Sequence, residues 1–165
     1  MYSKQTMSTD PPTSGILEKR RAQAEVIKPI YEVLVERLGK EEARSVIETA
    51  IKLAAIEEGK KYAEQEQGPT DLVRFAALQP AWMKSGALTI VPHRQTEKEL
   101  AYNVTRCKYA EMYTEMGLEE IGHLLSCNRD ATFCEGFNPR IKLKRTQTIM
   151  QGASHCDFRY KLEAG

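Results

Sequence analysis

The chain has 165 residues, of which 41% are hydrophobic and 28% charged, with a formal net charge of +1 at pH 7. These values predict a domain of ordinary size with a real hydrophobic core, and they exclude a largely disordered chain. The near-neutral charge gives no electrostatic footprint for nucleic acid, and no apolar run approaches the roughly 18 residues of a membrane span, so neither partner is expected.

Residues 1–14 are polar and rich in Pro, Ser and Thr, and they lack the apolar core of a secretory signal. We expect a flexible tail there, followed by a single domain over residues 15–165. Without an export signal, a reducing, cytoplasmic compartment is favoured, and the four cysteines are then free thiols, metal ligands or catalytic groups. Burial as small core residues is the alternative for each of them.

The N-terminal half reads as helical. Apolar residues recur at three- and four-residue steps over residues 16–38 and 41–67, which predicts two helices. Pro29 is expected to kink the first helix or to delay its start. Thr70-Asp71 can cap a third helix that runs through Leu78, and Pro80 is expected to end it.

After Gly86 the periodicity changes to alternation, which is typical of strands. The pattern predicts two strands over residues 88–91 and 100–104, followed by two helices over 109–116 and 118–125. A hairpin with strands over 141–149 and 155–162 is expected to follow. The expected fold class is α+β, with N-terminal helices packed on a C-terminal antiparallel β-sheet that carries inserted helices.

Strand alternation also assigns faces in the hairpin. Cys156 shares a side with Phe158 and Tyr160, and because this side is apolar, Cys156 is expected to point inward. On the partner strand Arg145 falls on the core-facing row, roughly opposite Tyr160. A buried guanidinium needs a partner, so Arg145 is either an anion clamp in a pocket or one half of a structural ion pair, for which Asp130 and Glu135 are candidates. A position at a strand edge, where Arg145 would reach water, is the remaining alternative.

Two other arrangements of the cysteines are disfavoured. Neighbours on a strand point to opposite faces, so His155 does not reach the sulfur of Cys156 unless a bulge or the turn reorients it. A helix over 126–137 would separate Cys127 and Cys134 by about 10 Å along its axis. Both sulfurs could not then lie about 2.3 Å from one zinc ion, and we expect neither a metal nor a cofactor. A composite site made of Cys156, one of Cys127 or Cys134, and Cys107 or His123 is the alternative that stays open, although no short spacing supports it.

The same helix does bring reactive groups to one side. Cys127, Asp130 and Cys134 recur at steps of three and four residues. If that side faces Cys156 and Arg145, the pocket between them holds thiols, a carboxylate and a guanidinium. Such a pocket suits a small polar substrate that bears a carboxylate.

A series of segments in the second half of the chain resembles the L-2-amino-thiazoline-4-carboxylic acid hydrolase family. The segments are Arg106–Glu111, Gly117–Gly122, Cys127–Asp130, Gly136–Pro139, Arg145-Thr146 and Gly152–Phe158. The resemblance implies hydrolytic opening of a small ring containing sulfur and nitrogen, on a route from the thiazoline to L-cysteine through a carbamoyl-cysteine. The motif positions that carry it are Cys107, Cys127, Asp130, Arg145, Cys156 and Asp157.

Together these patterns predict a hydrolase that acts on non-peptide C–N bonds in cyclic amidines or amides. Cys156 is the expected nucleophile or thiolate ligand, Asp130 activates water or the thiol, and Arg145 holds the substrate carboxylate. The predicted catalytic set also includes Cys127 and Asp157, and the predicted binding set also includes Cys107 and Tyr160.

One alternative function stays open. The segment from Gly152 to Phe158 also resembles the end of 4-vinyl-reductase-type small-molecule-binding domains, which implies a binding or sensing domain without catalysis. Trp82 is expected either in the core or at an oligomer contact, which leaves a homo-oligomer as an open alternative.

Overall fold

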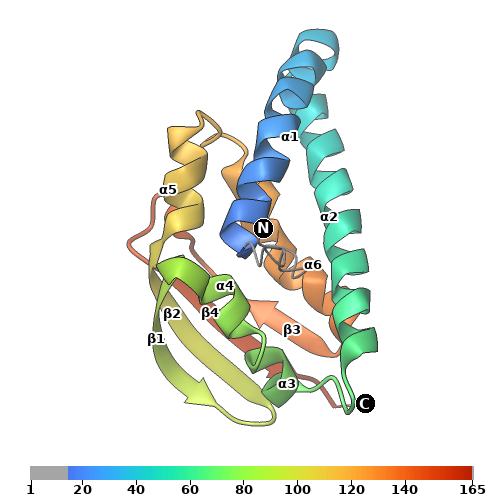
Figure 1. The fold of residues 1–165 in the computed structure, drawn as a ribbon, viewed down its shortest axis with the longest axis vertical. Coiled ribbons are helices and arrows are strands. Elements are labelled where there is room, and N and C mark those ends of the chain that lie inside the picture. The colour runs from blue at the N-terminus through green and yellow to red at the C-terminus, as the bar shows by residue number, and fades with distance from the viewer. Residues whose placement is uncertain (1–14, 165) are drawn as a thin grey trace, which may run out of the picture.

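Two long helices form the N-terminal half of the computed structural model, which describes residues 15–164. Helix α1 spans Ile16–Leu38 and α2 spans Lys40–Gln65, and Figure 1 shows them side by side. A single residue, Gly39, joins them at φ +83°, a left-handed conformation that glycine adopts without strain. Pro29 lies inside α1, so the expectation that it delays the start of this helix is wrong. The tail predicted for residues 1–14 lies outside the described residues.

A pair of short helices replaces the predicted third helix. Helix α3 spans Leu72–Ala76 and begins at Asp71, whose side chain accepts a hydrogen bond from the backbone N–H of Arg74 at 2.9 Å. Helix α4 spans Gln79–Met83, and Pro80 lies in its first turn. The expectation that Pro80 ends a helix is therefore wrong, because proline has no N–H to lose in a first turn and its fixed φ suits that position. A 3₁₀ turn, η1, follows at Lys84–Gly86.

Within the described range, the sheet has four antiparallel strands in the order β1-β2-β4-β3. They span Leu88–Gln95 for β1, Glu99–Cys107 for β2, Ile141–Lys144 for β3 and Cys156–Leu162 for β4. Strand β1 is longer than predicted and includes Pro92, which its register shifts accommodate.

Strand β3 is shorter than predicted, and Arg145 follows it instead of belonging to it. Leu143 is the residue paired with Tyr160, which corrects the register predicted for Arg145. The ladder ends here because the Asp157 carboxylate accepts the backbone N–H groups of Thr146 and Gln147, at 2.9 and 3.0 Å. A 3₁₀ turn, η3 (Ile149–Gln151), lies in the connection to β4.

Three helical segments are inserted between β2 and β3. Helix α5 spans Lys108–Glu115, a π-helical turn, η2, spans His123–Cys127, and α6 spans Asn128–Phe137. The helix predicted over 118–125 is wrong in its first half, where residues 118–121 form a turn, whereas 123–125 are helical and belong to η2. Single π-helical turns are rare and often occur at functional sites.

The buried apolar residues of the described chain form two hydrophobic clusters. One joins α1, α2, α5 and η2, and the other lies between the inner face of the sheet and helices α3 and α6. Helices α2 and α6 approach closely through two glycines. A Cβ on Gly59 would lie 2.2 Å from the Phe133 carbonyl oxygen, and one on Gly136 would lie 2.0 Å from the Ile56 carbonyl oxygen.

The long helices precede the sheet in the sequence, and Figure 1 shows them above this open antiparallel sheet. This arrangement confirms the predicted α+β class. Within residues 15–164, no helix combines the length and the apolar character needed to cross a membrane.

Candidate functional site

A cavity of about 110 Å³ lies between the inner face of the sheet and the helices. One part of its wall is aromatic, formed by side chains from α3, α4, β2, α6 and β4: Phe75, Trp82, Tyr102, Phe133, Phe158 and Tyr160. The rings of Tyr102 and Phe158 are stacked with their centroids 4.9 Å apart. Burial raises the pKa values of Tyr102 and Tyr160, so both phenols stay neutral.

The other part of the wall carries charges, and the first of two charged groups is the pair of Asp130 and Arg145. Arg145 donates from Nη1 to Asp130 Oδ2 at 2.5 Å and from Nη2 to the Cys127 carbonyl at 2.9 Å. Its guanidinium also lies over the Phe158 ring, 4.9 Å from the centroid. Arg145 therefore points inward as predicted, although it lies beyond the end of its strand.

The Asp130 carboxyl is held where proton transfer is feasible. About a third of its side-chain surface, 35%, is accessible, and it lines the cavity. Burial raises the pKa of Asp130 and the Arg145 guanidinium opposes that rise. A carboxyl with a raised pKa exchanges protons closer to neutral pH than an ordinary one.

Three of the four cysteines line the cavity: Cys107, Cys127 and Cys156. Burial raises the pKa of Cys107 to about 11 and that of Cys127 to about 12. Burial also raises the pKa of Cys156, but two contacts oppose it: a hydrogen bond that its sulfur accepts from the Ile149 N–H at 3.2 Å, and the nearby Arg145 guanidinium. These contacts favour a thiolate. Backbone N–H groups also act on Cys107 and the Arg145 guanidinium also acts on Cys127, but of these three thiols only Cys156 has both kinds of contact.

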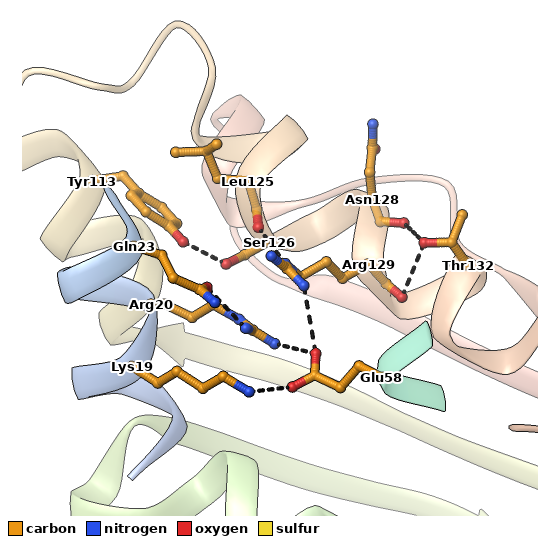
Figure 2. Close-up of polar contacts among 10 residues, drawn as sticks. All are labelled: Lys19, Arg20, Gln23, Glu58, Tyr113, Leu125, Ser126, Asn128, Arg129 and Thr132. Atoms are coloured by element: carbon orange, nitrogen blue, oxygen red, sulfur yellow. Dashed lines mark hydrogen bonds and ion pairs between the residues drawn. The ribbon is translucent and has the colours of Figure 1, made fainter. Parts of the chain in front are cut away.

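The second charged group combines Arg20, Glu58 and Arg129, and the sequence prediction missed it. Figure 2 shows Arg20 Nη2 and Arg129 Nη1 meeting the same Glu58 oxygen, Oε2, at 2.9 and 3.4 Å. The other oxygen, Oε1, accepts from Lys19 Nζ at 2.7 Å. Arg20 and Arg129 are only 5% and 8% exposed.

A local signal for this group does exist. Arg20 lies four residues after Ile16 and four before Ala24, so it falls on the apolar stripe of α1. Arg129 likewise follows Leu125 by four residues, and its Nε donates to the Leu125 carbonyl at 2.9 Å. A charged residue on an apolar helical stripe is the pattern that sequence reasoning could have used.

The π-helical turn η2 supplies further groups to the cavity. It contributes Ser126 and Cys127, and α6 continues directly from it with Arg129 and Asp130. The Ser126 hydroxyl is hydrogen-bonded to the Tyr113 hydroxyl at 2.7 Å (Figure 2). This contact fixes η2 against α5, and with it the start of α6.

Other predicted residues lie away from the cavity. Asp157 points to the opposite face of β4, where it binds the 146–147 segment. Burial alone would raise its pKa, but hydrogen bonds from the Thr146 hydroxyl and from the backbone of Gln147 and Thr146 lower it to about 2. Cys134 is buried outside the lining and donates to the Asp130 carbonyl at 3.4 Å. His155 contacts Gln147 and Ser154.

Of the predicted set, the structure brings together the residues that line the cavity: Cys107, Cys127, Asp130, Arg145, Cys156 and Tyr160. Among the described residues, no group of three or more His, Cys, Asp or Glu side chains is placed to hold a metal ion.

Comparison with known proteins gives one family match. A family model described as L-2-amino-thiazoline-4-carboxylic acid hydrolase matches residues 19–160. No curated protein matches the chain.

Solved structures share the fold at low identity. The phenol-responsive sensory domain of the transcription activator PoxR, with phenol, is 12% identical with a TM-score of 0.50, over 96% of this chain and 77% of that one. A trafficking protein particle complex subunit 3 from Naegleria fowleri, covalently bound to palmitic acid, is 10% identical with a TM-score of 0.50, over 87% of this chain and 97% of that one. At these identities the likeness shows the fold alone.

Proposed function

The chain belongs to the L-2-amino-thiazoline-4-carboxylic acid hydrolase family, and from that premise we propose that it hydrolytically opens the ring of a small cyclic amidine or amide. The observation that carries the proposal is that Cys156, Asp130 and Arg145 line one cavity with an aromatic wall. The wall suits a flat ring, and the polar end suits the reacting carbon and a carboxylate substituent.

In the proposed mechanism Cys156 is the nucleophile. Its sulfur attacks the amidine carbon, and its proton passes to Asp130. Asp130 then returns the proton to the ring nitrogen as the ring C–N bond breaks, which leaves the opened substrate attached to the sulfur. Water adds to the same carbon, releases the product as a carbonyl compound and restores the Cys156 thiol.

Arg145 acts in this scheme through Asp130. Both of its terminal nitrogens have partners, Asp130 and the Cys127 carbonyl, so its proposed role is to orient the carboxyl and moderate its pKa. The role predicted from the sequence, a direct clamp on the substrate carboxylate, would require it to leave one of these contacts.

The product identifies the bond that breaks in a 2-aminothiazoline. Breaking the ring C–N bond requires a proton donor at nitrogen and gives a free amine. Breaking the ring C–S bond expels a thiolate, which needs no such donor, and gives a free thiol. A thiol-specific reagent distinguishes these two products. An amine product without a free thiol supports the role of Asp130 as the acid, and a free thiol would refute that role.

The decisive experiment incubates the purified chain with 2-amino-thiazoline-4-carboxylate and follows the carbamoyl product by mass spectrometry. Cys156→Ser is expected to abolish ring opening with the fold retained. Cys134→Ser is the matched control, because Cys134 is buried outside the cavity lining and should keep its activity. Full activity of Cys156→Ser would refute the nucleophile.

One observation favours a second candidate, a non-catalytic binding or sensing domain. Burial raises the pKa values of all four cysteines, so at neutral pH the thiol form dominates in the free protein. The similar solved structures include a phenol-responsive sensory domain. Tight one-to-one binding of an apolar ring compound, without turnover of the thiazoline acid, would favour this function.

A further inference from the structure

The cavity wall carries more positive than negative charge. Among residues 15–164, its charged residues are three arginines and two acidic residues: Arg20, Arg129, Arg145, Glu58 and Asp130. Three guanidiniums against two carboxylates leave one positive charge in excess when all are ionised. Buried charges are costly unless they are matched, so this excess requires an explanation.

The excess belongs to the Arg20–Glu58–Arg129 group. Asp130 and Arg145 form a matched pair at 2.5 Å, which leaves Glu58 as the only carboxylate in the described part of the chain that pairs with the other two guanidiniums. Arg20 and Arg129 share the same Glu58 oxygen, and the second oxygen is taken by Lys19. One carboxylate therefore serves three cations (Figure 2).

Arg129 is the guanidinium with the weakest compensation. Its one ion pair with a described residue is the longer one to Glu58, at 3.4 Å, compared with 2.9 Å for Arg20. Burial lowers its pKa to about 10, and repulsion from Arg20 adds to this effect. A bound anion would offset both costs, since an arginine fork suits a carboxylate in particular.

We propose that Arg20 and Arg129 form an anion-binding subsite at the polar end of the cavity, and that this subsite holds the carboxylate of the ring substrate. The subsite itself follows from the charge and the contacts, whereas its assignment to a substrate carboxylate rests on the proposed function. It assigns carboxylate recognition to α1 and α6 and leaves Arg145 with Asp130.

The test measures binding without turnover. Thiazole-4-carboxylate is an aromatic ring acid without the reactive amidine, and thiazole-4-carboxamide is its neutral analogue. Calorimetric titration of the wild-type chain is expected to show about tenfold tighter binding of the acid, because hydrogen bonds to a charged group are stronger than neutral ones. Equal binding of the acid and the amide would overturn the subsite.

Two variants test whether the preference for the acid over the amide arises from Arg20 and Arg129. Arg129→Gln and Arg20→Gln are each expected to lower the affinity for the acid about tenfold while leaving that for the amide unchanged. Arg21→Gln is the matched control, since it removes the same charge from the neighbouring position of α1, where Arg21 pairs with Glu115 at the surface. An equal loss of acid and amide binding in both cavity variants would overturn the proposal.

Glu58→Gln gives a result that a purely structural role would not produce. Removing the competing carboxylate is expected to lower the melting temperature of the free protein, because two buried guanidiniums lose their partner. The same change is expected to strengthen binding of the acid, measured as a larger acid-induced rise in melting temperature than in the wild type. Weaker acid binding would overturn the subsite. Because the probe is not hydrolysed, failure of ring opening leaves the outcome of this test unaffected.

Discussion

Replacing Gly59 with alanine tests the close contact between α2 and α6 that places Glu58 beside Arg129. Gly59 follows Glu58 in α2, and its Cβ would lie 2.2 Å from the Phe133 carbonyl oxygen and 2.8 Å from the Phe137 nitrogen in α6. Both are backbone atoms, so no flexible side chain can move aside. To restore an ordinary contact of 3.4 Å, the helices must separate by about 1.2 Å.

The expected cost follows from two opposing effects. Overpacking in a core costs about 1–3 kcal/mol, and a backbone clash belongs at the upper end of that range. Alanine is about 1 kcal/mol better than glycine inside a helix, which offsets part of the cost. We therefore expect Gly59→Ala to lower the free energy of unfolding by about 2 kcal/mol, which for a chain of this size is a fall in melting temperature of about 4–8 °C.

Ligand binding in the cavity should change together with the stability of the fold. A separation of α2 from α6 draws Glu58 away from Arg129, whose contact is already long at 3.4 Å. Urea unfolding gives the stability, and titration with thiazole-4-carboxylate gives the effect on the cavity. In the control Gly39→Ala, the Cβ meets nothing within 4 Å, so only the strain of φ +83° is added and ligand binding should be retained. A Gly59→Ala variant as stable as the wild type would refute the reasoning.

Three further predictions concern the acidic groups and Arg145. Asp130→Asn should lower the rate of ring opening at least about 100-fold. In the wild type this rate should fall as the pH drops through the raised pKa of Asp130, and the rate of the variant should not show this fall at low pH. Arg145→Lys should lower kcat at unchanged KM if Arg145 orients Asp130, whereas a raised KM at unchanged kcat would indicate the clamp predicted from the sequence. The pKa of Asp157 is lowered to about 2, so its contribution to stability is present above its ordinary pKa near 4 and is lost as the pH falls toward 2. The wild type should therefore be more stable than Asp157→Asn above about pH 4, and this advantage should vanish as the pH falls toward 2. A stability advantage that does not depend on pH would contradict the prediction.

Strand parity is the part of the site that could be predicted from the sequence. Because successive strand residues alternate between faces, Cys156, Phe158 and Tyr160 were expected to point inward, and all three are buried. The same argument separated His155 from the Cys156 sulfur, and His155 contacts Gln147 and Ser154 instead. These inferences succeed because they need only the local geometry of one strand.

Strand register and helix boundaries were harder to predict from the sequence. The opposite partner of Tyr160 is Leu143, because the Asp157 carboxylate binds the 146–147 segment and ends the β3–β4 pairing before Arg145. No periodicity in the sequence encodes such a side-chain contact. The π-helical turn η2 is similarly invisible to a search for a 3.6-residue period.

Periodicity and motif order are local properties of the chain, so the sequence alone was enough to predict the two long N-terminal helices, the change to strands after Gly86, the α+β class, the family and the inward direction of Cys156. Which charges share the cavity depends on the packing of distant segments. Arg20 and Glu58 are 38 residues apart, and Glu58 and Arg129 are 71 apart. Each lies on a separate helix, so their shared ion pairs and the excess positive charge exist only once α1, α2 and α6 have packed.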